Sequence, residues 1–551
     1  MYLLIAAVGF VVIYPIASIV VKTFLLERGS ETVLSFQAWP QAFDQPGLVT
    51  SIFNTIKVVA LTQLISFPLA VVIAWLLART DIPMSGWIEF GFWVLYFLPA
   101  LGTTTGWLLL FDPSYGLANK FVVDVGLFDS APFNMYSFGG VVFAHLTTYS
   151  IAVKVMLLTP SFRSMDGTLD EASRICGAGG IGTLLRVVLP VLTPPLLVAF
   201  LMALIRSLES FEIELVLGLP ANFAVYSTKM YQILRGSPPD FAGASVLATV
   251  MLVLVAPLLV MQRWLSTRRS FASMTGQFKP ALRLLGAWRW PVFVLLAAAI
   301  SCMSLLPLML QLLGSLMTLF GFFELGEVWT LAHWHEAFDD AIFVNALSNT
   351  LVLGLGTAVA AVVAYAVVAY FTVRVAYRGR GVLDVLTWLP LTVPGVVLGF
   401  GFLWMTLQVP LFRPLYGTIG VLIFVCWLTS MTLGVQVMKS SMLMIGKDVE
   451  EAGRVVGGNW RRTFMKIVVP LMLPTMAVVG VIVFSQTIRS VSTIILLSTG
   501  ATTTLSVLQL EFLSTGRMGP ASVVGTIIVL MSVIAAMVVR VLATRFGIQA
   551  R

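Results

Sequence analysis

Charged side chains are scarce in this sequence: they make up 11% of its 551 residues, while 59% of the residues are hydrophobic. In soluble globular domains about a quarter of the residues are charged, so this composition excludes a row of soluble domains. A bilayer span needs roughly 20 mostly apolar residues, and about twelve such runs follow one another along the chain. The sequence therefore predicts a polytopic membrane protein.

Cysteine and histidine are also rare, with three residues of each. Cys176, Cys302 and Cys426 all fall in predicted spans or on the predicted cytoplasmic side, which excludes a disulfide framework. No string fits the nucleotide-binding pattern G-x-x-x-x-G-K-[ST], because Gly446-Lys447-Asp448 lacks the upstream glycine and the hydroxyl residue. The scattered histidines offer no pairing of nucleophile and base, so we expect no catalytic residues and no enzyme activity in this chain.

Basic residues are in excess, with a formal net charge of +8, but they are unevenly placed. The stretch 263–290 holds six Lys and Arg residues and no acid, whereas 322–341 holds five acids and no Lys or Arg. Lys and Arg mark the cytoplasmic side of a membrane protein, which places 263–290 inside and 322–341 outside. Membrane topology thus accounts for the basic balance, and no nucleic-acid partner is expected.

The predicted fold is all-α, with two parallel six-span halves that match each other. The spans are expected at 1–25, 50–78, 86–111, 138–160, 188–217, 242–265, 291–320, 345–372, 382–408, 416–438, 468–498 and 520–544. The first run, Tyr2 to Leu26, lacks the basic start and cleavage site of a signal peptide, so it is interpreted as a span. Whether a short tail precedes it stays open. The predicted domains are a first transmembrane domain (1–265), a basic cytoplasmic linker (266–290) and a second transmembrane domain (291–551).

One polar stretch occurs twice between these apolar runs. EASRICGAGGIGTLLRVVLPVLTP begins at Glu171, and EAGRVVGGNWRRTFMKIVVPLMLP begins at Glu451, 280 positions later. At a shift of 295 the halves match again, as in Asn54-Thr55 with Asn349-Thr350, Arg79 with Arg374, Pro99 with Pro394 and Gly106 with Gly401. The change of shift places fifteen extra residues in the loop 112–137 of the first half. A repeat at fixed spacing has to be explained before any other feature.

Each copy predicts a helix, a glycine turn and a second helix on the cytoplasmic surface. Acidic residues open the first helix, where they suit the positive end of its dipole. Gly177 and Gly457 fall about two turns later, where helices commonly end in a left-handed residue. Leu-Pro or Val-Pro then opens the next apolar run, since proline is tolerated in a first helical turn. The alternative is an ordinary interfacial loop that happens to recur.

These residues resemble the EAA loop of the membrane subunits of binding-protein-dependent ABC importers, and two copies in one chain resemble the fused permeases of the ferric-iron and thiamine branch. Ser173 and Gly453 depart from the alanine usual at the third motif position. The resemblance implies a multi-pass protein of the bacterial inner membrane, with both loops cytoplasmic. It also implies a cytoplasmic ATPase in two copies, which carries ATP and Mg while this chain holds no cofactor, and an extracytoplasmic substrate-binding protein. Membrane lipid is the remaining expected partner. The residues that would dock the ATPase are Glu171, Ala172, Arg174, Gly177, Glu451, Ala452, Arg454 and Gly457.

An acidic cluster at the end of the predicted fifth span is a candidate part of the transport path. Glu209, Glu212 and Glu214 lie there with Arg206 one turn before them, and ionisable groups inside a membrane normally face a cavity or a partner. The alternative is a rim that has reached water. Glu209 aligns with Arg489 in the second half, so the two could pair across the path as a gate; otherwise Glu209 pairs within its own half, with Arg206 for instance.

The histidines are given structural roles. His145 is interpreted as a hydrogen-bonded packing residue of the fourth span. His333 and His335 flank Trp334 in an external amphipathic helix, and no metal site is expected there. The resemblance favours ferric iron as the solute, with thiamine, polyamine or phosphonate as alternatives. An ion-coupled secondary transporter is a further alternative, for which Lys57 would be a candidate coupling charge.

Overall fold

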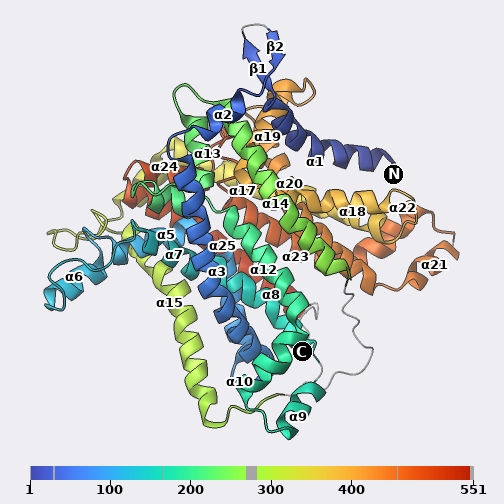
Figure 1. Cartoon of the computed structure of the whole chain (residues 1–551), viewed down its shortest axis with the longest axis horizontal. Coiled ribbons are helices and arrows are strands. Elements are labelled where there is room, and N and C mark those ends of the chain that lie inside the picture. The colour runs from blue at the N-terminus through green and yellow to red at the C-terminus, as the bar shows by residue number, and fades with distance from the viewer. Residues whose placement is uncertain (1, 29–30, 166, 269–281, 456, 546–551) are drawn as a thin grey trace. The chain divides into compact units, whose positions relative to one another are not determined.

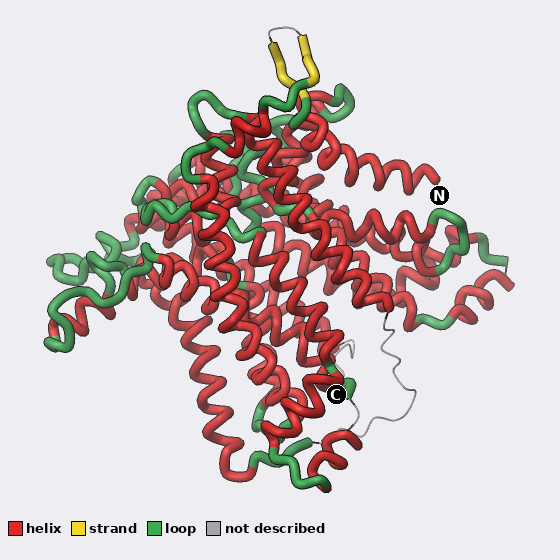
Figure 2. Tube along the Cα trace, in the orientation of Figure 1, coloured by secondary structure: helices red, strands yellow, loops and turns green. Residues whose placement is uncertain are grey.

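The computed structural model describes residues 2–28, 31–165, 167–268, 282–455 and 457–545, in which the regular structure is almost entirely helical (Figures 1 and 2). The exception is an antiparallel hairpin of β1 (Leu25–Arg28) and β2 (Glu31–Leu34), drawn in yellow in Figure 2. The predicted all-α fold is confirmed apart from this hairpin, which no feature of the sequence had predicted.

Nine helices of the described chain are long and apolar enough to cross a membrane, and three sharply bent pairs raise this number to twelve if each pair is one span. The long spans are α1 (Tyr2–Lys22), α3 (Leu48–Arg79), α7 (Phe138–His145) with η1 (Leu146–Ser150) and α8 (Ile151–Arg163), α14 (Phe241–Arg268), α15 (Arg289–Ser315), α17 (Ala341–Val373), α20 (Ile419–Met444), α22 (Trp460–Thr463) with η7 (Phe464–Val468) and α23 (Val469–Ile488), and α25 (Met518–Arg545). The expected span number is thus reached only by counting the bent pairs.

Two of the bends fall at matched prolines. Helices α4 (Ser85–Phe97) and α5 (Ala100–Phe111) meet at 97°, and the segment that begins with α18 (Arg380–Trp388) meets α19 (Gly395–Gln408) at 111°. Leu98 and Val393 have extended backbones because each precedes a proline, Pro99 or Pro394, and the proline ring excludes helical geometry there. The third pair bends by 74° at Leu192, between the segment Leu184–Val191 and α12 (Thr193–Leu208).

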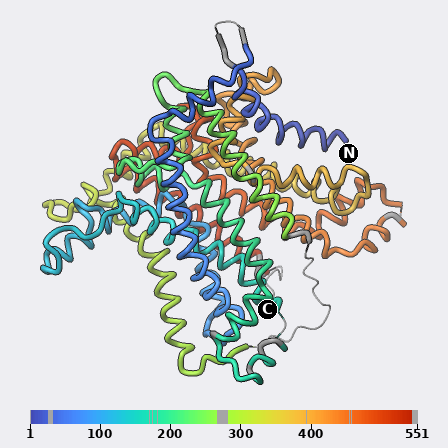
Figure 3. The backbone as a smooth tube through the Cα atoms, in the orientation of Figure 1, coloured from blue at the N-terminus to red at the C-terminus, as the bar shows by residue number. Residues whose placement is uncertain are grey.

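The first span of each half packs on helices of the other half. Figure 3 shows α1, in blue, beside the orange segment that holds α18 and α19, and α15 packs against α4 and α5 in the same way. Glycine permits both contacts, because a Cβ on Gly106 would lie 2.0 Å from the carbonyl oxygen of Pro307, and one on Gly401 would lie 2.8 Å from that of Pro15. The matched glycines are therefore points of close helix approach.

The fifth and eleventh spans end earlier than predicted, at Leu208 and Ile488. Matched side chains of α3 and α17 hold the segments that follow. Asn54 Nδ2 donates to the carbonyl of Ala224 at 3.0 Å, and Asn349 Nδ2 donates to that of Thr503 at 3.0 Å. The hydroxyls of the adjacent threonines of both pairs each accept a backbone N–H at 2.8 Å. The end predicted at 217 falls in the separate short helix η3 (Glu214–Gly218), and the end predicted at 498 falls in a connection of turns.

Short helices complete the chain. The matched Trp-bearing helices are α2 (Ala38–Phe43) and α16 (Ala332–Asp339), and the loop with fifteen extra residues holds α6 (Leu117–Asp124). The others are α9 (Thr168–Ile175), α10 (Gly180–Thr183), η2 (Leu184–Val188), α11 (Leu189–Val191), η3 (Glu214–Gly218), α13 (Tyr226–Arg235), η4 (Gly286–Trp288), η5 (Leu389–Thr392), η6 (Arg413–Leu415), α21 (Lys447–Val455) and α24 (Leu505–Ser514).

The chain forms two compact units that do not coincide with its sequence halves. One unit comprises 1–45, 230–252 and 332–551, and the other comprises 46–229 and 253–331. The division follows from the first spans, because each is counted with the helices it packs against. The predicted boundaries at 265 and 290 describe the internal repeat, and they stay a prediction about that repeat.

Candidate functional site

The first repeated loop folds as a helix that ends in a left-handed glycine. Helix α9 ends at Ile175, and Gly177 has φ +80°. The N–H of Ala178 donates to the carbonyl of Ser173 at 3.0 Å, which satisfies a carbonyl at the end of the helix. A Cβ at Gly177 would meet no described atom within 4 Å. The backbone conformation, and not lack of space, therefore requires glycine here.

The second loop repeats this geometry 280 residues later. Helix α21 ends at Val455, Gly457 has φ +80°, and the N–H of Gly458 donates to the carbonyl of Gly453 at 3.0 Å. Asn459 Oδ1 then accepts the N–H of Arg462 at 2.9 Å and caps the following helix. The left-handed helix ends predicted at both glycines are confirmed.

In the second loop the second helix runs directly into the next span, whereas in the first loop a 74° bend at Leu192 separates it from α12. We had expected a fresh helix that opens with proline in both loops. Helices α10 and α22 continue through the π turns η2 and η7, which come just before Pro190 and Pro470. A proline inside a helix cannot donate a backbone hydrogen bond and its ring clashes with the carbonyl one turn earlier, which a wider turn relieves. A displacement of the second helix would therefore be passed directly to the span in the second loop, and across the bend at Leu192 in the first.

Both loops present matched residues to solvent. Glu171 and Glu451 are exposed, as are Ala172 and Ala452. The side chains of Ile175 and Val455, which align with each other, are each 87% exposed. An exposed aliphatic side chain at the same place in both copies is a natural contact for a partner protein. The side chains of Arg174 and Arg454 lie outside the described residues, so their predicted roles stay predictions.

A matched arginine from the second span of each half holds the chain just before each loop. Arg79 Nη1 donates to the carbonyl of Met165 at 3.0 Å, and Arg374 Nη2 donates to the carbonyls of Met442, at 3.0 Å, and Ile445. Met165 and Ile445 align at the shift of 280. The side chains of Arg79 and Arg374 are almost wholly buried, so each ties its loop to the end of a long span.

In the second half this arginine also meets a carboxylate. Arg374 Nε lies 3.0 Å from Glu450 Oε1, and the Tyr370 hydroxyl donates to Glu450 Oε2 at 3.0 Å. Trp75 aligns with Tyr370 in the first half and has no hydroxyl to offer. Glu450 is 5% exposed while the adjacent Glu451 is exposed. Of these neighbouring acids, Glu450 therefore forms contacts within the chain and Glu451 faces solvent.

A second pair of contacts braces the spans next to the loops. Glu89 on α4 accepts two hydrogen bonds from Arg163 at the end of α8, at 2.6 and 3.3 Å. Asp384 on α18 aligns with Glu89 and pairs with Lys439 on α20. Each half therefore joins its third and fourth spans by one ion pair near the repeated loop.

The acidic cluster is split between two arrangements. Glu209 lies directly after α12, with Oε2 3.5 Å from Arg206 Nη1, and Glu212 is partly exposed. Glu214 is buried, and its Oε1 lies 2.8 Å from His145 Nε2, while Ser210 donates to Oε2 at 2.6 Å. The hydrogen-bonded role predicted for His145 is confirmed, with a carboxylate as its partner.

These contacts do not test the predicted gate pair of Glu209 and Arg489. Glu209 and Arg489 belong to different compact units, and their pairing stays a prediction. Arg206 supplies a local partner for Glu209, which is the alternative considered above. Glu209 and Arg206 are 12% and 54% exposed respectively, so this pair is not deeply buried.

Lys154 is a buried cation that the sequence analysis did not identify. Lys154 on α8 is 1% exposed, and its Nζ contacts Ser66 Oγ at 2.7 Å, Ser150 Oγ at 2.9 Å and the Ser150 carbonyl at 3.0 Å. All three ammonium protons thus have acceptors beside the π turn η1. Lys57, which the sequence had offered as a coupling charge, is exposed on α3. A lone lysine in the apolar run 151–160 was the signal that could have identified Lys154.

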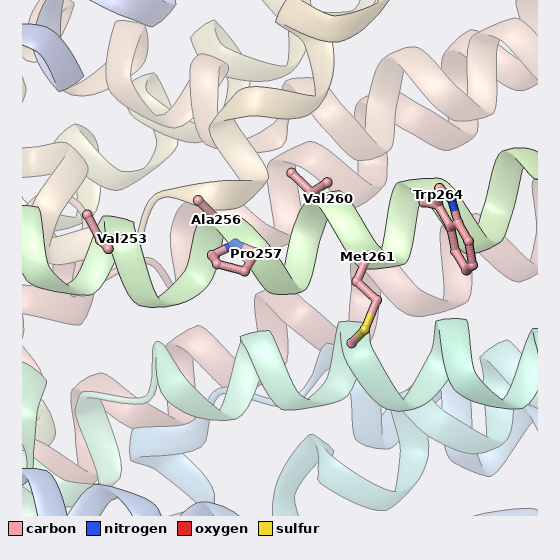
Figure 4. A pocket seen from close by; sticks show the side chains of 6 residues that line it. All are labelled: Val253, Ala256, Pro257, Val260, Met261 and Trp264. Carbon is pink, nitrogen blue, oxygen red and sulfur yellow. The ribbon is translucent and has the colours of Figure 1, made fainter.

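A hollow along α14 has no polar lining (Figure 4). Its side chains all come from one helix: Val253, Ala256, Pro257, Val260, Met261 and Trp264. Such a surface suits the acyl chains of lipid and offers no ligand to a hydrated solute.

Comparison with known proteins gives the loops a family context. Residues 376–548 match the family described as "Binding-protein-dependent transport system inner membrane component". The chain is 24% identical over 405 residues to the ferric transport system permease protein FbpB of Actinobacillus pleuropneumoniae, and 26% identical over 393 residues to the protein named FbpB 1 of Haemophilus influenzae. These alignments cover 72% and 70% of this chain, and the chain spans 57% and 60% of the length of those relatives. It is also 26% identical over 452 residues to y4fN of Sinorhizobium fredii, a protein with the name of an ABC transporter permease; the alignment covers 79% of this chain and 77% of y4fN.

Proposed function

We propose that this chain is a permease subunit of an ATP-driven importer. The proposal starts from residues 376–548, which match the family of binding-protein-dependent transport system inner membrane components. The helices of the chain form the path for a small solute, and a separate cytoplasmic ATPase drives transport. An extracytoplasmic binding protein delivers the solute. The observation that carries this proposal is the pair of exposed loops with matched backbones, each closed by a left-handed glycine and each followed by a second helix that leads toward the next span.

Two equivalent loops suit two copies of one ATPase. Each loop ends its first helix at the same conformation, and each exposes an aliphatic side chain at the same position. Identical partners need equivalent surfaces, which a matched repeat provides. We place both loops on the cytoplasmic side, because basic residues gather in the second loop and in the stretch that links the halves.

Ferric iron is the proposed solute. Two relatives carry names that refer to ferric transport or its FbpB permease. The carboxylates Glu209 and Glu212 are suited to a hard cation in the proposed path, since oxygen ligands favour such ions. Thiamine, a polyamine or a phosphonate would instead be indicated if the partner binding protein selected one of them.

The test is reconstitution. The full chain is purified from its native membrane with its associated subunits and placed in vesicles, and uptake of radioactive ferric iron is measured with the binding protein added. We expect that uptake requires ATP on the side of the membrane where the ATPase is bound, and the binding protein on the opposite side. Uptake by the lone chain along an ion gradient would overturn the importer proposal, and ATP-dependent uptake of another solute would overturn the choice of iron alone.

A further inference from the structure

The end of the stretch that links the two halves is bound to the end of α3. Arg283 N–H donates to the carbonyl of Arg79 at 2.8 Å, and the N–H of Asp81 donates to the carbonyl of Arg283 at 3.3 Å. Asp81 Oδ1 then accepts the N–H of Leu285 at 2.7 Å. Three hydrogen bonds within three residues fix residues 283–285 along 79–81.

The same stretch touches the first repeated loop through a side chain. A Cβ on Gly180 would lie 2.7 Å from Cζ and 2.9 Å from Nη1 of Arg283, so the guanidinium lies directly on the glycine backbone that begins α10. Arg79, whose carbonyl receives the Arg283 N–H, also donates its guanidinium to Met165 just before α9. The linking stretch, the end of α3 and both ends of the loop therefore form one closed set of contacts, all within a single compact unit.

The second loop is supported at this position by its own side chain. Trp460 aligns with Gly180, and its ring lies 6.0 Å from that of Tyr370, 5.8 Å from that of Phe371 and 5.8 Å from that of Phe464. This aromatic packing supports the start of α22 in addition to the cap from Asn459. The two loops thus reach one backbone geometry with different supports.

We propose that Arg283 is a positioning residue of the first loop, so that the linking stretch is a structural part of one docking loop and not of the other. The name docking loop rests on the proposed function, but the contact between Arg283 and Gly180 does not depend on it. The planar guanidinium is needed because it lies flat against a residue without a side chain, which an ammonium on a flexible stem would do poorly. One loop is thereby stabilised from outside the repeat, and the other from within it.

Hydrogen exchange of the full chain in lipid nanodiscs tests this without any partner protein. The variant Arg283→Ala should exchange about five-fold faster in peptides of residues 168–183, the effect of losing one local contact, with no change in 447–463. The variant Trp460→Gly should do the reverse. Arg289→Ala removes the same charge from an exposed site nearby and serves as the matched control, with both peptides unchanged.

A rescue separates positioning from general damage. Gly180→Trp in the Arg283→Ala background should restore slow exchange, because Trp75 and Leu184 occupy the places of Tyr370 and Phe464 and already belong to one apolar cluster. Arg283→Lys should restore little. Equal acceleration of both peptides in Arg283→Ala, or no acceleration in either, would overturn the proposal. A correct exchange pattern in a protein that retains no ATPase would leave the support intact and count against the proposed function alone.

Discussion

The two repeated loops share a backbone but not the contacts that hold it. Both end their first helix at a glycine with φ +80°, and both are tied to a second-span arginine. In the second loop Glu450 adds a buried ion pair, whereas in the first loop Ser173 donates to or accepts from Thr183 at 2.9 Å. The left-handed backbone that favours glycine is the same in both copies, while the tertiary supports differ. The experiments below test the shared part and the different parts separately.

The largest effect is expected from Arg374→Met. It leaves the buried Glu450 carboxylate without its cation and two carbonyls without their donor, which costs about 3–5 kcal/mol in comparable cases. The free energy of local opening of residues 447–463, measured by hydrogen exchange, should fall by that order. Arg378→Met, at an exposed position on the same connection, is the control. Addition of Glu450→Gln should recover part of the loss; if it makes the loop weaker still, the ion pair is not the main cause.

The next largest effect is expected from valine at either left-handed glycine. Gly177→Val and Gly457→Val should each cost about 1–3 kcal/mol of loop stability, because a β-branched residue resists φ +80°. Retention of the ATPase in a pull-down should fall for both. Asparagine tolerates this region of backbone space, so Gly177→Asn and Gly457→Asn should be milder. Equal retention by the valine and asparagine variants would show that φ is not what the position requires.

Tyr370→Phe removes a hydrogen bond that the second loop has and the first loop lacks. The hydroxyl donates to a buried carboxylate, so its loss should cost about 1.5 kcal/mol in the second loop only. Opening of residues 447–455 by hydrogen exchange is the readout. Tyr377→Phe is the matched control, since the Tyr377 hydroxyl has no hydrogen-bond partner among the described residues. An effect as large from the control would mean that removal of a tyrosine hydroxyl as such, and not the bond to Glu450, explains the change.

The smallest effect concerns the third motif position. Ser173→Ala should cost about 0.5–1 kcal/mol in the first loop, through loss of the bond to Thr183. In the second loop Gly453 leaves the buried Thr463 hydroxyl without a partner among the described residues. Gly453→Ser and Gly453→Ala both place a Cβ 2.6 Å from Ile467 Cδ1, which must shift, so the comparison of the two isolates the added hydroxyl. The serine variant should be the more stable of the two. Identical exchange rates in these two variants would show that the added hydroxyl does not reach Thr463.

Parts of the fold and the candidate site that depend on short stretches of sequence were predictable. The membrane class follows from apolar runs, and the turns at Gly177 and Gly457 follow from a glycine placed after an amphipathic helix. Pro99 and Pro394 were matched in the sequence, but 86–111 and 382–408 were each predicted as one span and no bend was predicted at either proline. The early end of the fifth span was missed because Asn54 and Ala224, which fix it, are 170 residues apart.

The sequence by itself determined the repeat, the apolar spans and the left-handed turns, because each depends on the backbone preferences or hydrophobicity of a few neighbouring residues. Only the tertiary structure decided which supports hold those turns. Arg79 and Arg374 could be matched by sequence, yet the carbonyls they bind became visible only once helices far apart in the chain were brought together. The same holds for Arg283 on Gly180, because nothing in a linear string shows that a glycine 103 positions earlier leaves room for a guanidinium. Long-range packing, which local propensity does not encode, made two similar loops into two differently supported ones.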